Sequence, residues 1–295
     1  MYRLIYFIIA LISFNSFSQD EWEHIATVNP GQFPFGESNI DPQEGAARSV
    51  AISNGGLTGV DNEYEIIIAE GDDGFVIVSR LIYEPTNGGI LPFTSQIGQV
   101  LTGEYQGNAG YSVDLSGDGS IVAYSAPDNI ESGTWNGQPN SSTPERGIVY
   151  VYENVNDNWV QLGNDIVGYN SGFGHDIVLS DDGLTIAISN VENHVGFESG
   201  VVRIYELINN IWQQKGQDIV GDQALERFGY SLSFNNAGDV LAIGAPFYDD
   251  SSIFNPGGKE GRVEIYEYQE NNQWNLQNEF NHNWPNNGYT GAYFG

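Results

Sequence analysis

Paired acidic residues in turns are the first side chains of this sequence whose types and spacing could do chemistry. Four pairs fit this description: Asp114 with Asp118, Asp181 with Asp182, Asp249 with Asp250, and Asp72 with Asp73. Calcium takes six to eight oxygen ligands from a flexible loop, so one pair supplies two ligands, which is too few alone. Asp and Gly are also ordinary turn formers. The sequence therefore leaves two interpretations open, a calcium site and plain turns.

Aromatic side chains in two long loops are the second group, and they suit binding. Trp135 lies in the loop 128–146, and the loop 247–261 carries Phe247, Tyr248 and Phe254. Both loops follow the same element of a repeat, so we expect them on one face of the protein. Loops on a rigid scaffold commonly carry binding residues. We predict that these four residues contact a glycan or an extracellular protein, the alternative being surface loops without a function.

Catalytic motifs are sparse. None of the histidines His24, His175, His194 and His282 stands in an H-E-x-x-H pattern, and no G-x-S-x-G segment is present. We interpret His175 as a surface or interface residue. Carboxylates are plentiful, but no pair is distinguished as a glycosidase pair. The sequence favours a protein that is not an enzyme, and the alternatives are a hydrolase or lyase acting on extracellular polysaccharide and a passive spacer.

A four-part repeat must position these residues. Each copy has a strand beginning near Gly-Tyr-Ser, a turn, an apolar strand, and a Tyr-Glu strand followed by Trp. Three clear copies begin at Gly110, Gly174 and Gly229 and contain Trp159, Trp212 and Trp274. A fainter copy precedes them from about residue 45. Tandem copies of about 55–65 residues indicate a fold made of similar units that pack on their neighbours.

Each copy has the pattern of a strand meander. In "FGYSLSF" (228–234) bulky and small residues alternate, which is the period of a β-strand. Proline ends the second strand at Pro127 and Pro246, because it cannot donate to a central ladder. We predict an all-β fold, a β-propeller of four-stranded antiparallel blades, with a β-sandwich or a β-solenoid as alternatives. The predicted blades are 45–97, 98–162, 163–215 and 216–277, with the start of another at 278–295.

The repeat resembles the FG-GAP family. Phe228-Gly229 and Gly244-Ala245-Pro246 match both defining elements, and two looser copies hold Ala109-Gly110 with Ser125-Ala126-Pro127, and Phe173-Gly174 alone. The resemblance covers about residues 45–295. It implies an integrin α-type β-propeller that serves adhesion or ligand binding outside the cell. Such repeats often carry a D-x-D-x-D-G calcium loop, and no turn here matches it strictly.

The last residues begin the repeat again. "GAYFG" ends in Phe294-Gly295, the first element of a further copy. Four blades can close a ring, but rings of the family more often have seven. We therefore expect a propeller that is incomplete at its C-terminus, with coding that continues beyond residue 295.

Composition and the N-terminal segment indicate where in or outside the cell the protein acts. Nine basic and 39 acidic residues give a net charge of −30, which argues against a nucleic acid partner and is compatible with a solvated acidic surface or with cation binding. The chain has no cysteine. Residues 1–18 have the charge, apolar stretch and small residues of a signal peptide, the alternative being an anchored helix. We expect 19–295 to be secreted or displayed on the cell surface, with no transmembrane segment after cleavage.

Overall fold

The protein is built from strands. The structure is a computed structural model that describes residues 49–57, 64–72, 74–83, 94–103, 108–127, 146–169, 172–191, 199–248 and 261–281. These residues form twenty strands, without a helix, in four antiparallel sheets. This confirms the predicted all-β class with blades of the β-propeller kind. The predicted signal peptide and residues 282–295 lie outside the described residues.

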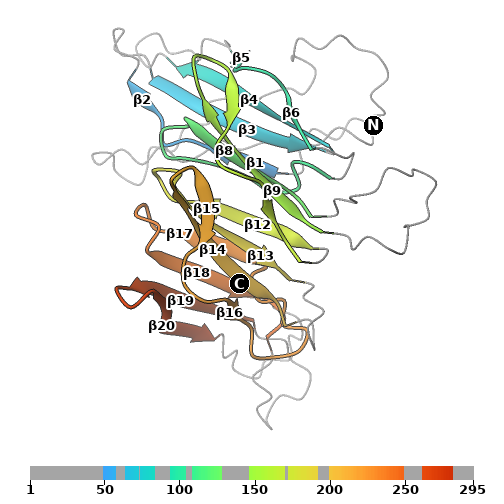
Figure 1. Cartoon of the computed structure of the whole chain (residues 1–295), viewed down its shortest axis with the longest axis vertical. Helices are drawn as coiled ribbons and strands as arrows, with labels where there is room; N and C mark the ends of the chain where they lie inside the picture. Colours follow the sequence, from blue (N-terminus) through green and yellow to red (C-terminus); the bar gives the residue numbers. More distant parts are fainter. Residues whose placement is uncertain are drawn as a thin grey trace, which may run out of the picture.

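The four sheets follow one another along the chain (Figure 1). The first sheet contains β1 (Ser49–Ile52), β2 (Gly56–Leu57), β3 (Tyr64–Asp72), β4 (Phe75–Tyr83), β5 (Thr94–Gln96) and β6 (Leu101–Thr102). The second contains β7 (Val113–Leu115), β8 (Ile121–Ala126), β9 (Ile148–Asn154), β10 (Trp159–Gln161) and β11 (Ile166–Val167). The third contains β12 (Phe173–Leu179), β13 (Thr185–Asn190), β14 (Val201–Ile208), β15 (Ile211–Gln214) and β16 (Ile219–Val220). The fourth contains β17 (Ser231–Phe234), β18 (Val240–Ala245), β19 (Arg262–Gln269) and β20 (Gln273–Asn281).

Each sheet is a meander of four main strands. In the third sheet the order is β12-β13-β14-β15, and the second and fourth sheets have the same order of elements. The first three sheets also have short strands beside the meander, of which β6, β11 and β16 pair with the third strands β4, β9 and β14. These short strands belong to the preceding sheet and not to the next one. The first strands of the next sheets therefore begin several residues after 98, 163 and 216, where the sequence predicted that the blades start.

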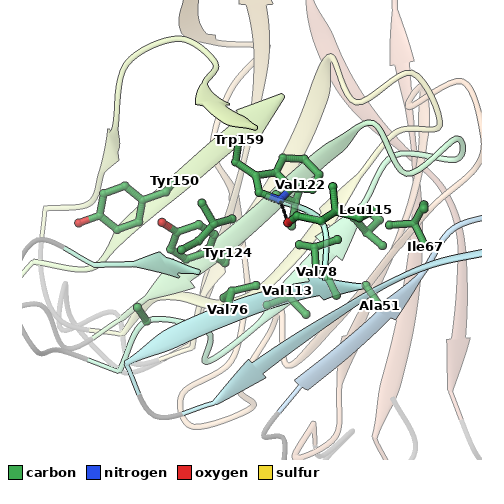
Figure 2. Packing of buried hydrophobic residues seen from close by; sticks show 14 of the residues in the cluster. Ala51, Ile67, Val76, Val78, Val113, Leu115, Val122, Tyr124, Tyr150 and Trp159 are labelled. Atoms are coloured by element: carbon green, nitrogen blue, oxygen red, sulfur yellow. Dashed lines mark hydrogen bonds between the residues drawn. The ribbon is translucent and has the colours of Figure 1, made fainter. Parts of the chain in front are cut away.

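Hydrophobic clusters lie between consecutive sheets. Between the first and second sheets, Val76 and Val78 of β4 pack with Val122 and Tyr124 of β8, and all four are at most 1% exposed. Figure 2 shows these side chains converging, with Trp159 beside them. Similar clusters join the second sheet to the third and the third to the fourth. Each sheet therefore buries its apolar face on its neighbour, as the repeat predicted.

A tryptophan latch joins the outer strands of neighbouring sheets. The Trp212 indole Nε1 donates a hydrogen bond to the carbonyl of Leu162 (2.8 Å), and its backbone N–H donates to Asn164 Oδ1 (2.9 Å). Trp159 and Trp274 make the same two hydrogen bonds, each to a carbonyl and a side-chain oxygen of the preceding sheet. A Cβ at Gly163, which has φ +79°, would lie 2.7 Å from Trp212 Cδ1. The four-residue acceptor segments are 96–99, 161–164 and 214–217, each with glycine in its third position.

The inner strands are joined at their turns. The Asn54 N–H donates to the Gly117 carbonyl (2.8 Å), the Gly117 N–H to the Asp181 carbonyl (2.8 Å), and the Asp181 N–H to the Asn236 carbonyl (3.0 Å). These residues occupy the same place in four successive sheets. The bonds form a ladder that fixes the register of the four turns, and it lies at the opposite end of the sheets from the Gly-Ala-Pro elements.

Candidate ligand-binding site

The Gly-Ala-Pro end of the sheets collects the side chains best suited to binding. We use this name for the end where β8, β13 and β18 finish and where β7, β12 and β17 begin. The pairing of Ser231 with Gly244 and of Ala245 with Arg262 places the starts of β17 and β19 at this end. The predicted binding residues Phe247 and Tyr248 directly follow β18 and lie here.

An aromatic row crosses three sheets at this end. It consists of Tyr111, His175 and Tyr230, each directly after a repeat glycine. The Tyr111 and His175 ring centroids are 5.7 Å apart, and those of His175 and Tyr230 are 5.0 Å apart. Tyr230 is 42% exposed, and the other two rings are half-buried. Glycine is needed before the row because Gly174 and Gly229 have φ of +94° and +88°, and a Cβ there would press on Ser125 and Ser189.

His175 is the polar member of the row. Burial, and then the nearby positive charge of Arg227, lower the pKa of its imidazole. The ring is therefore neutral at neutral pH, with one nitrogen as donor and the other as acceptor. Among the described residues its buried Nδ1 has no hydrogen-bond partner.

A buried charged cluster supports the loop that leads to β17. Arg262 is 3% exposed, and its Nη2 lies 3.0 Å from Glu226 Oε2 and 2.8 Å from Asp222 Oδ1. Its Nη1 lies 3.1 Å from Glu264 Oε1. The guanidinium carbon also lies 4.0 Å from the Tyr248 ring centroid. Burial raises the pKa of Glu226 to about 7 and also raises that of Glu264.

The cluster replaces apolar residues of the other sheets. Ala126, Asn190 and Ala245 end the second strands and pair with Ile148, Val201 and Arg262 respectively. Ile148 and Val201 are buried, so the second and third sheets fill this position with hydrocarbon. A buried ion pair in place of a well-packed apolar residue seldom adds stability. This departure from the repeat therefore indicates a role other than packing.

The pair ties the loop before β17 to β19, and this loop is left-handed at Arg227 as the chain is at Asn108 and Gly172, the same position in the two sheets before it. Glu226 is 0% exposed, while Leu225 and Arg227 on either side point to solvent with φ of +65° and +55°. Positive φ is unfavourable for residues other than glycine. The Arg227 guanidinium lies 5.1 Å from the Phe247 ring centroid. The buried pair thus presents Arg227 next to Phe247 and near the aromatic row.

The acidic residues predicted to bind calcium are occupied within the protein. Asp114 Oδ2 accepts a hydrogen bond from the Leu179 N–H (2.6 Å), and burial raises the pKa of Asp114 to about 6. Asp118 Oδ1 accepts from Ser116 Oγ and from the Ser120 N–H and hydroxyl. Asp182 and Asp181 accept from Ser180 Oγ (2.6 Å) and Asn54 Nδ2 (3.4 Å) respectively.

Other predicted site residues are not brought together. Within the described parts of the chain, no group of three or more His, Cys, Asp or Glu side chains could hold a metal ion. Trp135, Phe254, Asp249 and Asp250 lie outside the described residues. Of the predicted binding residues, the structure therefore places Phe247 and Tyr248 at the candidate site, and calcium binding stays a prediction.

Sequence reasoning missed the centre of this site. It treated Tyr111, His175 and Tyr230 as repeat markers, and it did not single out Glu226, Arg227 or Arg262. A column-by-column comparison of the repeats carries the missing signal, because Arg262 stands where the other copies have Ile148 and Val201.

Comparisons with known proteins identify no family for this chain. No family model matches the chain, and no curated protein matches it. Among solved structures, one that is similar comes from Bacteroides uniformis and is provisionally named a 6-phosphogluconolactonase, with 15% identity and a TM-score of 0.44. The match covers 76% of this chain and 55% of that one, so the chain spans about half of its length. No helix in the described ranges has the length and apolarity to cross a membrane.

Proposed function

We propose that this chain is a secreted or cell-surface binding module of the FG-GAP type, which holds its ligand at the Gly-Ala-Pro end of the sheets. The observation that carries the proposal is the exposed Arg227 near the aromatic row, on a loop that the buried Glu226–Arg262 pair ties to β19. A passive spacer has no need for buried charges at one end of one sheet.

Binding without catalysis fits the site better than hydrolysis. A glycosidase needs two carboxyl groups that contact the sugar, one of them with a raised pKa. Glu226 and Glu264 have raised pKa values, but they are 0% and 5% exposed and are engaged by Arg262. We therefore assign them to positioning the loop. A ligand would contact Tyr230 and Arg227, both of which are exposed.

The test is a binding screen with paired variants. The mature chain is immobilised and screened against extracellular glycans and proteins, first as wild type and then as Tyr230→Ala. The matched control is Ile211→Ala, because Ile211 is 52% exposed and lies at the opposite end of the third sheet. We expect Tyr230→Ala to weaken binding at least about tenfold, as for a central aromatic contact. Equal affinity of both variants for every ligand found would overturn the proposal.

A further inference from the structure

The distribution of positive charge points to the chemistry of the ligand. The chain has only nine basic residues against 39 acidic ones. Arg80, Arg203, Lys215 and Arg262 each have a carboxylate partner. Within the described residues, Arg146 and Arg227 have none. Arg146 lies two residues before β9 and Arg227 lies four residues before β17, so both lie at the Gly-Ala-Pro end.

Arg227 is the better placed of these two cations. It is exposed and lies near the aromatic row, and its guanidinium packs over the Phe247 ring. The structure gives this guanidinium no hydrogen bond to a described residue. Arginine presents five donors in a planar fork that matches the two oxygens of a carboxylate. An exposed arginine that has no carboxylate partner among the described residues of so acidic a protein is suited to an anionic group brought by a ligand.

The aromatic row suits the rest of such a ligand. A sugar ring has a face of C–H groups that can pack on an aromatic ring, and hydroxyl groups at its edge. Tyr230 offers a ring that is 42% exposed, beside the half-buried ring of His175. A carboxylate group alone would use Arg227, but it would leave the exposed ring of Tyr230 unused.

We infer that the ligand is a carboxylated sugar, such as a uronic acid residue of an extracellular polysaccharide. Its carboxylate pairs with Arg227 while its ring packs on Tyr230 and His175. This inference rests on the proposed function. The net charge of −30 repels a long polyanion, so we expect recognition of a short or terminal acidic segment.

The experiment uses two probes that differ only in charge. Oligogalacturonic acid and its methyl ester have the same rings and linkages, but the ester lacks the negative charges. Affinities of both probes are measured by calorimetry for the mature wild-type chain, Arg227→Gln, Tyr230→Ala and the control Arg80→Gln. Arg80 has carboxylate partners and is not at the candidate site, so this control removes one positive charge elsewhere.

We expect the acid to bind at least about tenfold more tightly than the ester, because hydrogen bonds to a charged group are the stronger kind. Arg227→Gln should remove this preference, Arg80→Gln should keep it, and Tyr230→Ala should weaken both probes. Equal binding of acid and ester by the wild type would overturn the carboxylate assignment and leave the binding site standing.

Two further outcomes separate this inference from the proposed function. If neither probe binds but a protein ligand does, and Tyr230→Ala weakens that ligand, the sugar class is wrong and the site is right. If the acid binds and Tyr230→Ala has no effect, both the inference and the proposed site are wrong.

Discussion

Glu226 and Arg262 form an ion pair of 3.0 Å inside the protein, where both side chains are almost wholly buried. The pair links the loop before β17 to the first residue of β19. Arg262 takes the place that Ile148 and Val201 fill in the second and third sheets. Because burial raises the pKa of Glu226 to about 7, keeping its charge there is costly. The pair is best understood as a device that ties the loop to β19.

Removing one partner of this pair should destabilise the protein more than removing both. Glu226→Ala leaves Arg262 buried with less compensation, which should lower the free energy of unfolding by about 3 kcal/mol. The double variant Glu226→Ala/Arg262→Val has the residue of the third sheet at position 262, and it should recover part of this loss. Urea unfolding of the wild type, Glu226→Ala, Arg262→Val and the double variant gives the coupling energy between the two charges.

Additive effects in that cycle would show that the two charges do not depend on one another. The double variant supplies a second readout. It should fold and still lose affinity for any ligand of the Gly-Ala-Pro end, because Arg227 is no longer held in place.

Stability should fall as the pH rises from about 4 to 7. Burial raises the pKa values of Asp114 and Asp176 to about 6 and that of Glu226 to about 7. The folded protein therefore binds these protons more tightly than the unfolded chain, whose carboxyl groups titrate near pH 4. The stabilising contribution of these protons is complete below about pH 4 and is lost as the pH rises through 6 to 7.

Urea midpoints at several pH values between 4 and 7.5 measure this slope. Asp114→Asn removes one of the titrating groups, so the variant should show a shallower dependence whatever its absolute stability. A midpoint that increases over this range in the wild type would contradict the raised pKa values.

The tryptophan latch can be tested at its glycine. Gly163→Ala adds a Cβ that meets Trp212, and Gly74→Ala provides the control, because Gly74 has φ +100° with no atom within 4 Å of its Cβ position. Both variants bear the cost of alanine in a left-handed conformation, about 1 kcal/mol. We expect Gly163→Ala to lose at least about 1 kcal/mol more, as for overpacking. Equal losses in thermal or urea unfolding would mean that the indole moves aside freely.

The acidic turns should act as turn caps whether or not calcium is present. Asp118 accepts three hydrogen bonds within its own turn, so Asp118→Ala should cost about 1–2 kcal/mol. The loss should be the same with added calcium and with a chelator. A melting temperature that rises with calcium in the wild type, but not in this variant, would instead favour the calcium interpretation.

The sheets could be predicted from sequence because their signals are local. Alternation in "FGYSLSF", the glycine turns and the proline after β18 lie within one strand or between paired strands. The short strands β11 and β16 escaped prediction because two residues carry no period. The contacts of the tryptophan latch were also missed, since they join residues of different repeats, such as Trp212 and Leu162.

The candidate site was predictable only in part, for a related physical reason. Phe247 and Tyr248 were found because an aromatic residue in a loop is unusual by itself. The row of Tyr111, His175 and Tyr230 depends on ring contacts between sheets, which the period within one strand does not reveal. The left-handed conformation of Arg227 recurs at Asn108 and Gly172, the same position of the repeat, but an arginine there does not signal it by its residue type.

The latch also bears on how such an array can grow by gene duplication. The second and third sheets each carry a tryptophan for the sheet before and an acceptor segment for the sheet after. A duplicated unit would therefore carry both the tryptophan and the acceptor segment. It could be inserted between two other units without changes in either of them. The fourth sheet has Trp274 but has Asn278 where Gly163 and Gly216 stand. It can be joined to a unit before it, whereas a unit added after it would need a joint of another kind.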